Sequence, residues 1–231
     1  MMTWETILSE DDFRLYRENI SLLEEQVISR FPDGYKAPEI LTAIRNVPRH
    51  LFVRKEYRYL AYTDNAFPTF HGLTTSAPSV IAEMIYLSGI RRGGHLLEIG
   101  TGTGYQASVL LEMGADVCTI EIDSAAAASA ERILSRLGYK SGRLKLFNRN
   151  GAPGLPEHAP FDAIIVSAAV QNLKDISRLR GQLKNRGRLL FLFGSRNSQK
   201  LHIVERNKND FSVSVLEGVT FSFVPLVSPE M

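Results

Sequence analysis

The stretch Leu97-Glu98-Ile99-Gly100-Thr101-Gly102-Thr103-Gly104-Tyr105 decides the fold class of this chain. An apolar strand pattern over Leu96–Ile99 leads into three glycines, and a helical pattern follows over Tyr105–Met113. Glycines let the backbone turn tightly and approach a ligand, and the first amides of the following helix face the crevice beside the strand. The stretch therefore predicts a strand–turn–helix unit with a cofactor site at Gly100, Gly102 and Gly104.

Strand and helix patterns alternate downstream of this unit. In chain order, these segments are Val117–Glu121, Ser124–Leu137, Leu144–Phe147, Ala163–Val166 and Leu189–Phe193. Such alternation predicts a doubly wound α/β fold with a mostly parallel sheet and right-handed crossovers. Three more strand patterns follow without helices between them, which indicates an antiparallel edge; they are Leu201–Glu205, Phe211–Leu216 and Val219–Val224.

The first third of the chain reads as helical. Apolar residues recur at helical spacing over Leu15–Ile28 and Pro38–Arg45, with a turn expected at Phe31–Gly34. Tyr57–Pro78 has no sustained period, and a loop of that length in a compact domain is more often functional than idle. We therefore expect an N-terminal helical extension over residues 1–56 and one larger domain over residues 57–231.

Composition is that of an ordinary globular enzyme, with 231 residues, 44% hydrophobic and 23% charged. The formal net charge of +2 is too small to indicate nucleic acid or a membrane surface as a partner. No apolar run approaches the ~20 residues of a membrane span, and Met1–Asp12 lacks a signal-peptide pattern. The single cysteine, Cys118, rules out an intrachain disulfide, and its apolar surroundings predict a buried thiol. Together these features predict a cytoplasmic location.

Two kinds of nucleotide cofactor compete for the glycine motif. A dinucleotide site favours Gly or Ala three residues after Gly102, where this chain has the bulky Tyr105. Glu98 would also place a carboxylate beside a pyrophosphate, which is repulsive. S-adenosylmethionine has no phosphate and carries two positive groups, and Glu121, at the end of the next strand, can accept hydrogen bonds from its ribose. The residues therefore favour S-adenosylmethionine over a dinucleotide.

Several blocks outside the glycine motif form a specific set. They are Val47-Pro48-Arg49 leading into Phe52-Val53, Tyr62-Thr63-Asp64, Thr74-Thr75-Ser76-Ala77-Pro78, Ala159–Ile164, Gly187-Arg188-Leu189 and Phe223-Val224-Pro225-Leu226. With the glycine motif, these blocks resemble the protein-L-isoaspartate O-methyltransferase family over most of the chain. The resemblance implies a Rossmann-like methyltransferase fold with a sheet of the seven-stranded type.

The same resemblance implies a substrate and site residues. The substrate would be the free carboxylate of an isoaspartyl residue in a damaged protein or peptide, with S-adenosylhomocysteine as the other product. Ser76 would take the active-site role, with Thr74 and Thr75 lining the methyl donor. A carboxylate with a pKa near ~4 is already ionised at neutral pH, so the transfer needs positioning and no general base. We therefore interpret His71 as structural, and the scattered histidines predict no metal site.

Two positions depart from the family pattern. Where the family usually has Gly-Asp-Gly, this chain has Arg149-Asn150-Gly151. The resemblance assigns that aspartate to the adenine amino group, so we expect Asn150 to keep the contact more weakly and Arg149 to narrow the adenine pocket. Ser222 stands where bacterial relatives often carry arginine, just before the segment that lines the peptide in the family.

Alternatives remain open at this point. The chain could be a diverged paralogue that methylates a carboxylate on a small molecule or a biosynthetic peptide, or a non-catalytic module that binds S-adenosylmethionine. For Ser76, the structural alternative is to cap a helix over Pro78–Leu87, because serine is a favoured N-cap residue. The oligomeric state is not readable from the sequence.

Overall fold

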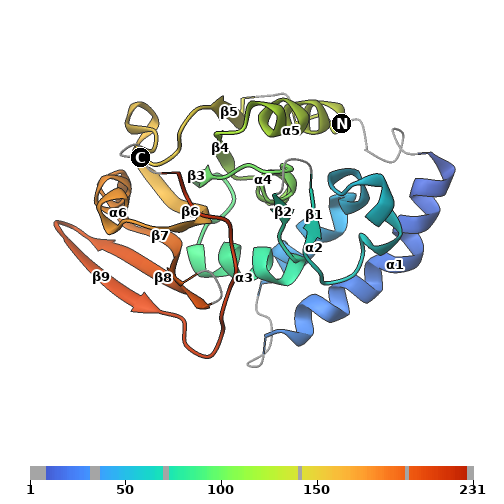
Figure 1. Cartoon of the computed structure of the whole chain (residues 1–231), viewed down its shortest axis with the longest axis horizontal. Helices are drawn as coiled ribbons and strands as arrows, with labels where there is room; N and C mark the ends of the chain where they lie inside the picture. The colour runs from blue at the N-terminus through green and yellow to red at the C-terminus, as the bar shows by residue number, and fades with distance from the viewer. Residues whose placement is uncertain (1–8, 32–36, 70–72, 140–141, 196–197, 228–231) are drawn as a thin grey trace.

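The computed structural model describes residues 9–31, 37–69, 73–139, 142–195 and 198–227. Its centre is a seven-stranded sheet in the order β5-β4-β3-β6-β7-β8-β9 (Figure 1). The strands are β3 (His95–Ile99), β4 (Asp116–Glu121), β5 (Leu144–Asn148), β6 (Phe161–Val170), β7 (Leu183–Ser195), β8 (Ser198–Asn207) and β9 (Asp210–Val215). The first five strands in this order, from β5 to β7, pair in parallel. β8 and β9 are added antiparallel at one edge, which confirms the expected fold class.

The strand order reverses beside β3. From β3 the chain winds outward through β4 to β5, then returns to β6 on the other side of β3. Doubly wound sheets bind ligands in the crevice at the carboxyl ends of the strands where the order reverses. The crossover helices are α4 (Tyr105–Glu112), α5 (Ser124–Arg136) and α6 (Leu173–Arg180). The eight-residue α6 has no counterpart among the sequence predictions.

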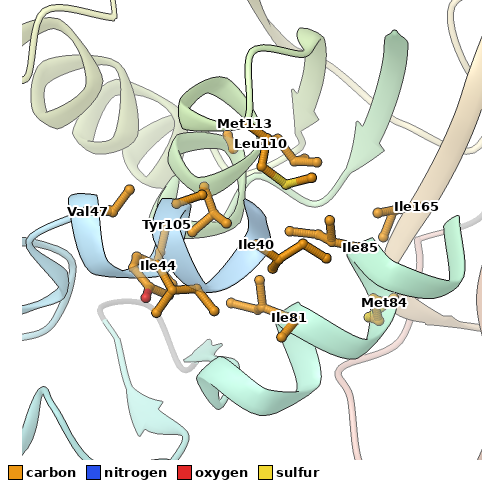
Figure 2. Packing of buried hydrophobic residues seen from close by; sticks show 14 of the residues in the cluster. Ile40, Ile44, Val47, Ile81, Met84, Ile85, Tyr105, Leu110, Met113 and Ile165 are labelled. Carbon is orange, nitrogen blue, oxygen red and sulfur yellow. The ribbon is translucent and has the colours of Figure 1, made fainter. Parts of the chain in front are cut away.

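The N-terminal helices share a core with the sheet domain. They are α1 (Glu10–Ser29) and α2 (Pro38–Asn46), followed by the short helices η2 (Arg49–Phe52) and η3 (Lys55–Leu60) and by α3 (Pro78–Ser88). Figure 2 shows apolar side chains of α2, α3 and α4 meeting, among them Ile40, Ile44, Ile81, Ile85 and Leu110, together with Met113 directly after α4. The division at residue 56 stays a prediction, but the extension is packed into one continuous core.

One expected strand is wrong. Val219–Val224 forms no strand; Phe221 makes a single bridge to Gln199 of β8, and Pro225, just after the segment, makes one to Ala169 of β6. Gly218 has φ +80°, and three residues later Phe221 exchanges both backbone hydrogen bonds with Gln199 at the start of β8. The segment then crosses the sheet towards the end of β6, as the red trace in Figure 1 shows.

The remaining expectations divide by region. The expected loop over Tyr57–Pro78 begins within η3 and contains a two-residue ladder between β1 (Phe67–Pro68) and β2 (Thr74–Thr75). Cys118 is 1% exposed, and burial raises the pKa of its thiol to about 11, so the buried thiol is confirmed. Most of the turn expected at Phe31–Gly34, and His71, lie outside the described residues. Among the described helices, none is long and apolar enough to cross a membrane.

Candidate functional site

A cavity opens at the carboxyl ends of β3, β4 and β6, where the strand order reverses. It encloses about 1080 Å³ of empty space, its open mouth included. Nine of the ten predicted site residues line it: Thr74, Thr75, Ser76, Glu98, Gly100, Gly102, Glu121, Asn150 and Gly151. The fold therefore brings together residues from four separate parts of the sequence.

The glycines of the motif differ in what they face. Gly100, Gly102 and Gly104 have φ of +97°, +54° and +86°, a region that favours glycine. A Cβ on Gly102 would meet nothing within 4 Å, because this residue faces the open cavity. A Cβ on Gly104 would instead lie 3.3 Å from Leu134 of α5. Gly104, which is outside the cavity lining, serves the close packing of α4 on α5.

Glu121 joins the end of β4 to the glycine motif. It is 5% exposed, and its carboxylate accepts the Gly102 N–H at 2.8 Å and the Asp123 N–H at 3.0 Å. These bonds hold the side chain against the cavity, with lone pairs left to accept hydrogen bonds from a ligand. Glu121 lines the cavity, and its role as acceptor for ribose hydroxyls stays a prediction.

Glu98 is wholly buried at the cavity floor. Its carboxyl accepts the Gln106 Nε2–H at 2.9 Å and the Thr119 hydroxyl, and Thr101 bonds Thr119 in turn. Burial raises the pKa of Glu98 to about 8, so the group holds its proton through neutral pH. The expectation of a negatively charged Glu98 is therefore wrong, because burial removes the water that would stabilise the carboxylate.

Replacing Glu98 by glutamine should alter how the stability of the cofactor-free protein depends on pH. The ordinary pKa of this group is 4.5, so between 4.5 and about 8 the folded state binds a proton that the unfolded state releases. Stability from this group therefore falls as pH rises through that window. We expect the wild type to lose on the order of 3 kcal/mol relative to Glu98→Gln from about pH 5 to about pH 8, measured by urea unfolding. Parallel pH profiles would contradict a buried neutral carboxyl.

Ser76 lines the cavity and lies two residues before the start of α3. The N-cap of α3 is Ala77, without a side-chain cap bond, and the Ser79 N–H is bonded instead by Asp64 Oδ1 at 2.8 Å. The capping alternative for Ser76 is therefore wrong. Within the described residues, the Ser76 hydroxyl has no hydrogen-bond partner, so it is available to a ligand.

Arg149 and Asn150, which differ from the family pattern, point to different surroundings: only Asn150 is in the described cavity lining. The Asn150 side chain lines the cavity, and its Oδ1 accepts the Ala152 N–H at 2.9 Å. The Arg149 guanidinium pairs with Glu157 and lies 5.3 Å from the centre of the Phe147 ring. Arg149 is absent from the described lining, so the expected narrowing of the adenine pocket is wrong.

The far wall of the cavity is the segment Phe223–Val227. Ala169 of β6 holds it through two backbone bonds of 2.7 Å, to Val224 and Leu226. The buried Gln199 of β8 holds both backbone groups of Phe223, with Nε2 to its carbonyl at 3.0 Å and Oε1 to its N–H at 2.6 Å. Sequence reasoning missed Gln199, for which an inward-facing amide in a strand is the only signal. Ser222 is exposed and does not line the cavity.

The cavity lining contains carboxylic acids and uncharged side chains in the described residues. Among the described residues that line the cavity, none is Lys, Arg or His, whereas two are carboxylic acids, Glu98 and Glu121. A pyrophosphate would find no basic side chain there. A sulfonium with an ammonium would meet the Glu121 carboxylate and neutral polar groups, which include the protonated Glu98. With Gly102 open to the cavity, the donor set fits S-adenosylmethionine. The described residues hold no group of three or more potential metal ligands.

Comparisons with known proteins identify the family of this chain. The family model Protein-L-isoaspartate(D-aspartate) O-methyltransferase (PCMT) matches residues 22–231. A protein-L-isoaspartate O-methyltransferase of Gloeobacter violaceus is 42% identical over 198 residues, covering 84% of this chain and 93% of the relative. One of Methanospirillum hungatei is 39% identical over 194 residues, covering 84% and 87%.

Solved structures agree on the fold. A Plasmodium falciparum protein assigned to the same activity, crystallised with S-adenosyl-L-homocysteine, superposes with a TM-score of 0.75 at 21% identity. The superposition covers 90% of this chain and 98% of that one. Because the family model spans nearly the whole chain and the sequence relatives cover most of it, the chain belongs to the protein-L-isoaspartate(D-aspartate) O-methyltransferase family.

Proposed function

We propose that this enzyme transfers a methyl group from S-adenosylmethionine to the free carboxylate of L-isoaspartyl residues in damaged proteins and peptides. The observation that carries the proposal is one cavity that joins the glycine motif, Glu121 and the Ser76 segment without a basic side chain in its described lining. Methylation turns the carboxylate into an ester with a better leaving group. The chain can then close to a succinimide and reopen partly as normal aspartate, which is a repair.

Different residues of the cavity bind different parts of the methyl donor. Glu121 accepts hydrogen bonds from the ribose hydroxyls, and the backbone at Gly100 and Gly102 leaves room for the donor beside it. Asn150 and Gly151 border the adenine, while Thr74 and Thr75 line the methionine side. Support comes from the position of these residues around one cavity and from the open space at Gly102.

The chemistry requires placement more than proton transfer. Bound S-adenosylmethionine supplies a methyl group already activated as a sulfonium, and the acceptor carboxylate is ionised at neutral pH. Ser76 donates its hydroxyl proton in a hydrogen bond to one carboxylate oxygen, leaving the other oxygen to face the methyl group. Phe223–Val227 forms the wall along which the peptide lies. In-line alignment of oxygen, methyl carbon and sulfur is the contribution of the protein.

A methanol-release assay with an isoaspartyl peptide and its normal aspartyl twin tests the proposal. We expect turnover of the isoaspartyl peptide alone. Turnover of neither peptide, with another carboxylate accepted, would favour a diverged paralogue. Binding of S-adenosylmethionine with no acceptor turned over would favour a non-catalytic module. The cytoplasmic location is a further part of the proposal, supported by the single buried thiol of Cys118 and testable by cell fractionation.

Asn150→Asp should tighten the binding of S-adenosylhomocysteine. The amide oxygen of Asn150 is uncharged and already accepts the Ala152 N–H, so it bonds the adenine amino group weakly. A carboxylate makes stronger hydrogen bonds, by about 1 kcal/mol, which corresponds to about fivefold in Kd. Calorimetric titration of both proteins measures the difference. Tighter binding by the wild type would show that Asn150 does not face the adenine amino group.

A further inference from the structure

Two sequence blocks that carry the family resemblance do not line the cavity in the described residues. They are Val47-Pro48-Arg49 and Tyr62-Thr63-Asp64. Arg49 is 0% exposed and the Asp64 side chain is 6% exposed. Both side chains contact the backbone around Ser76, which suggests a common purpose.

Arg49 binds four backbone carbonyls with one guanidinium. Nη1 donates to Ala61 at 2.7 Å and Thr63 at 3.1 Å, and Nη2 donates to Asn65 at 2.7 Å and Ser76 at 3.1 Å. No carboxylate among the described residues lies within ion-pair distance of it. A fully buried cation is costly unless its donors are satisfied, and a planar fork suits several fixed acceptors. The two Nη groups of Arg49 meet this need with four carbonyls, whereas its Nε–H has no acceptor within the described residues. This side chain thus ties the loop over residues 61–65 to the backbone of Ser76.

The same guanidinium also contacts the cofactor motif. Its central carbon lies 5.2 Å from the centre of the Phe67 ring and 5.5 Å from that of Tyr105. Tyr105 is the residue that follows the three glycines and begins α4. Figure 2 shows Tyr105 in the core beside Ile44 and Val47 of the segment that leads to Arg49. The serine segment and the glycine motif are therefore fixed to one rigid group.

Asp64 holds the other end of the Ser76 segment. Its Oδ1 accepts the Ser79 N–H at 2.8 Å, which satisfies a free amide in the first turn of α3. Its own N–H is bonded by Gln26 Oε1 of α1 at 2.7 Å. The Ser76 carbonyl and the Ser79 amide are thus held by side chains that lie 27 and 15 residues upstream.

The bonds from Arg49 and Asp64 matter for the position of the Ser76 hydroxyl, because few other contacts hold this residue. Its hydroxyl has no partner within the described residues, and β2 before it is only two residues long. The direction of the hydroxyl therefore follows from its backbone. For an in-line transfer, a displacement of about 1 Å costs on the order of 100-fold in rate.

We propose that Arg49 and Asp64 are positioning residues that fix the Ser76 hydroxyl relative to the glycine motif. The proposal rests on the proposed function, since it assigns them a part in methyl transfer to the isoaspartyl carboxylate. They act through the serine backbone and do not touch the substrate.

A double-mutant cycle of Arg49→Lys and Ser76→Ala tests this. A lysine cannot bind both the 61–65 loop and Ser76, so we expect kcat/KM for the isoaspartyl peptide to fall at least tenfold, with the Kd for S-adenosylhomocysteine within threefold. In the Ser76→Ala background, Arg49→Lys should change kcat/KM less than twofold, because its effect passes through the hydroxyl. Effects that simply multiply would overturn the proposal.

Asp64 provides a second arm should Arg49→Lys fail to fold. Asp64→Ala removes the acceptor for the Ser79 N–H, and we expect kcat/KM to fall at least fivefold. Asp64→Asn keeps an oxygen in place, so it should recover most of that loss. Val204→Ala, a core variant in the buried part of β8, serves as the control for general destabilisation and should keep kcat/KM within twofold. Equal losses in Asp64→Ala and Asp64→Asn would contradict a role through the backbone bond.

Hydrogen–deuterium exchange separates this proposal from the proposed function. We expect faster exchange over residues 73–79 in Arg49→Lys and Asp64→Ala than in the wild type. A wild type that methylates no isoaspartyl peptide defeats the proposed function, and faster exchange would still support the grip on Ser76. Unchanged exchange in both variants overturns the grip whatever the activity.

Discussion

Glu121→Gln should weaken the binding of S-adenosylhomocysteine by about 100-fold, or ~3 kcal/mol. The carboxylate of Glu121 has one oxygen bonded by Gly102 and the other by Asp123, and both still have lone pairs for the ribose hydroxyls. Glutamine has one acceptor oxygen, so its NH2 group would replace one carboxylate oxygen and would face a backbone N–H that it cannot bond. The variant therefore loses charge-assisted bonds to the ligand and loosens the glycine motif at the same position.

Asp116→Asn is a matched control for this measurement. Asp116 begins the strand that Glu121 ends, and it is outside the described cavity lining. Its substitution also removes one negative charge, so it reports any effect of net charge on binding. We expect its Kd for S-adenosylhomocysteine to stay within twofold of the wild type. A similar loss in both variants would mean that Glu121 acts through the overall field of the protein and not by contact.

Ser76→Ala should lower kcat/KM for an isoaspartyl peptide by about 10- to 100-fold, because a hydrogen bond to a charged group contributes about 1.5–3 kcal/mol. The Kd for S-adenosylhomocysteine should hardly change, since the hydroxyl is assigned to the acceptor and not to the donor. Steady-state kinetics with the peptide and calorimetry with the product separate the two effects.

Ser79→Ala provides the control for Ser76. Ser79 lies one turn further along, is 6% exposed and does not line the cavity in the described residues. Its backbone N–H, which bonds Asp64, is retained in alanine. Turnover by Ser79→Ala should match the wild type. If Ser76→Ala also matches the wild type, the assigned role of the hydroxyl is wrong.

The sheet and the cofactor end of the site were predictable because their signals are local. Buried parallel strands read as short apolar runs, and three glycines after such a run indicate a tight turn. β3, β4 and the start of α4 fall within a residue of their expected positions. Glu121 was found for the same reason, since an acid at the end of the second strand lies beside the first strand's glycine turn in this topology.

The other half of the site depends on contacts between distant residues, which a local pattern does not contain. Gln199 of β8 holds Phe223, and Asp64 caps a helix that begins 14 residues later. The segment around Phe223 has a strand-like composition, yet it makes single bridges to two different strands, at Gln199 of β8 and at Ala169 of β6. Likewise, nothing local shows that Arg149 turns to Glu157 and leaves the cavity.

The position of Cys118 has a practical consequence for labelling. The chain's one thiol lies inside β4, 1% exposed, and its raised pKa leaves very little thiolate to react at neutral pH. A maleimide dye or spin label should therefore not react with Cys118 in the native state. A cysteine introduced at an exposed position would become the single reactive handle without first removing the natural one. Motion of the Phe223–Val227 wall against the sheet can then be followed by fluorescence or electron paramagnetic resonance in an otherwise unaltered enzyme.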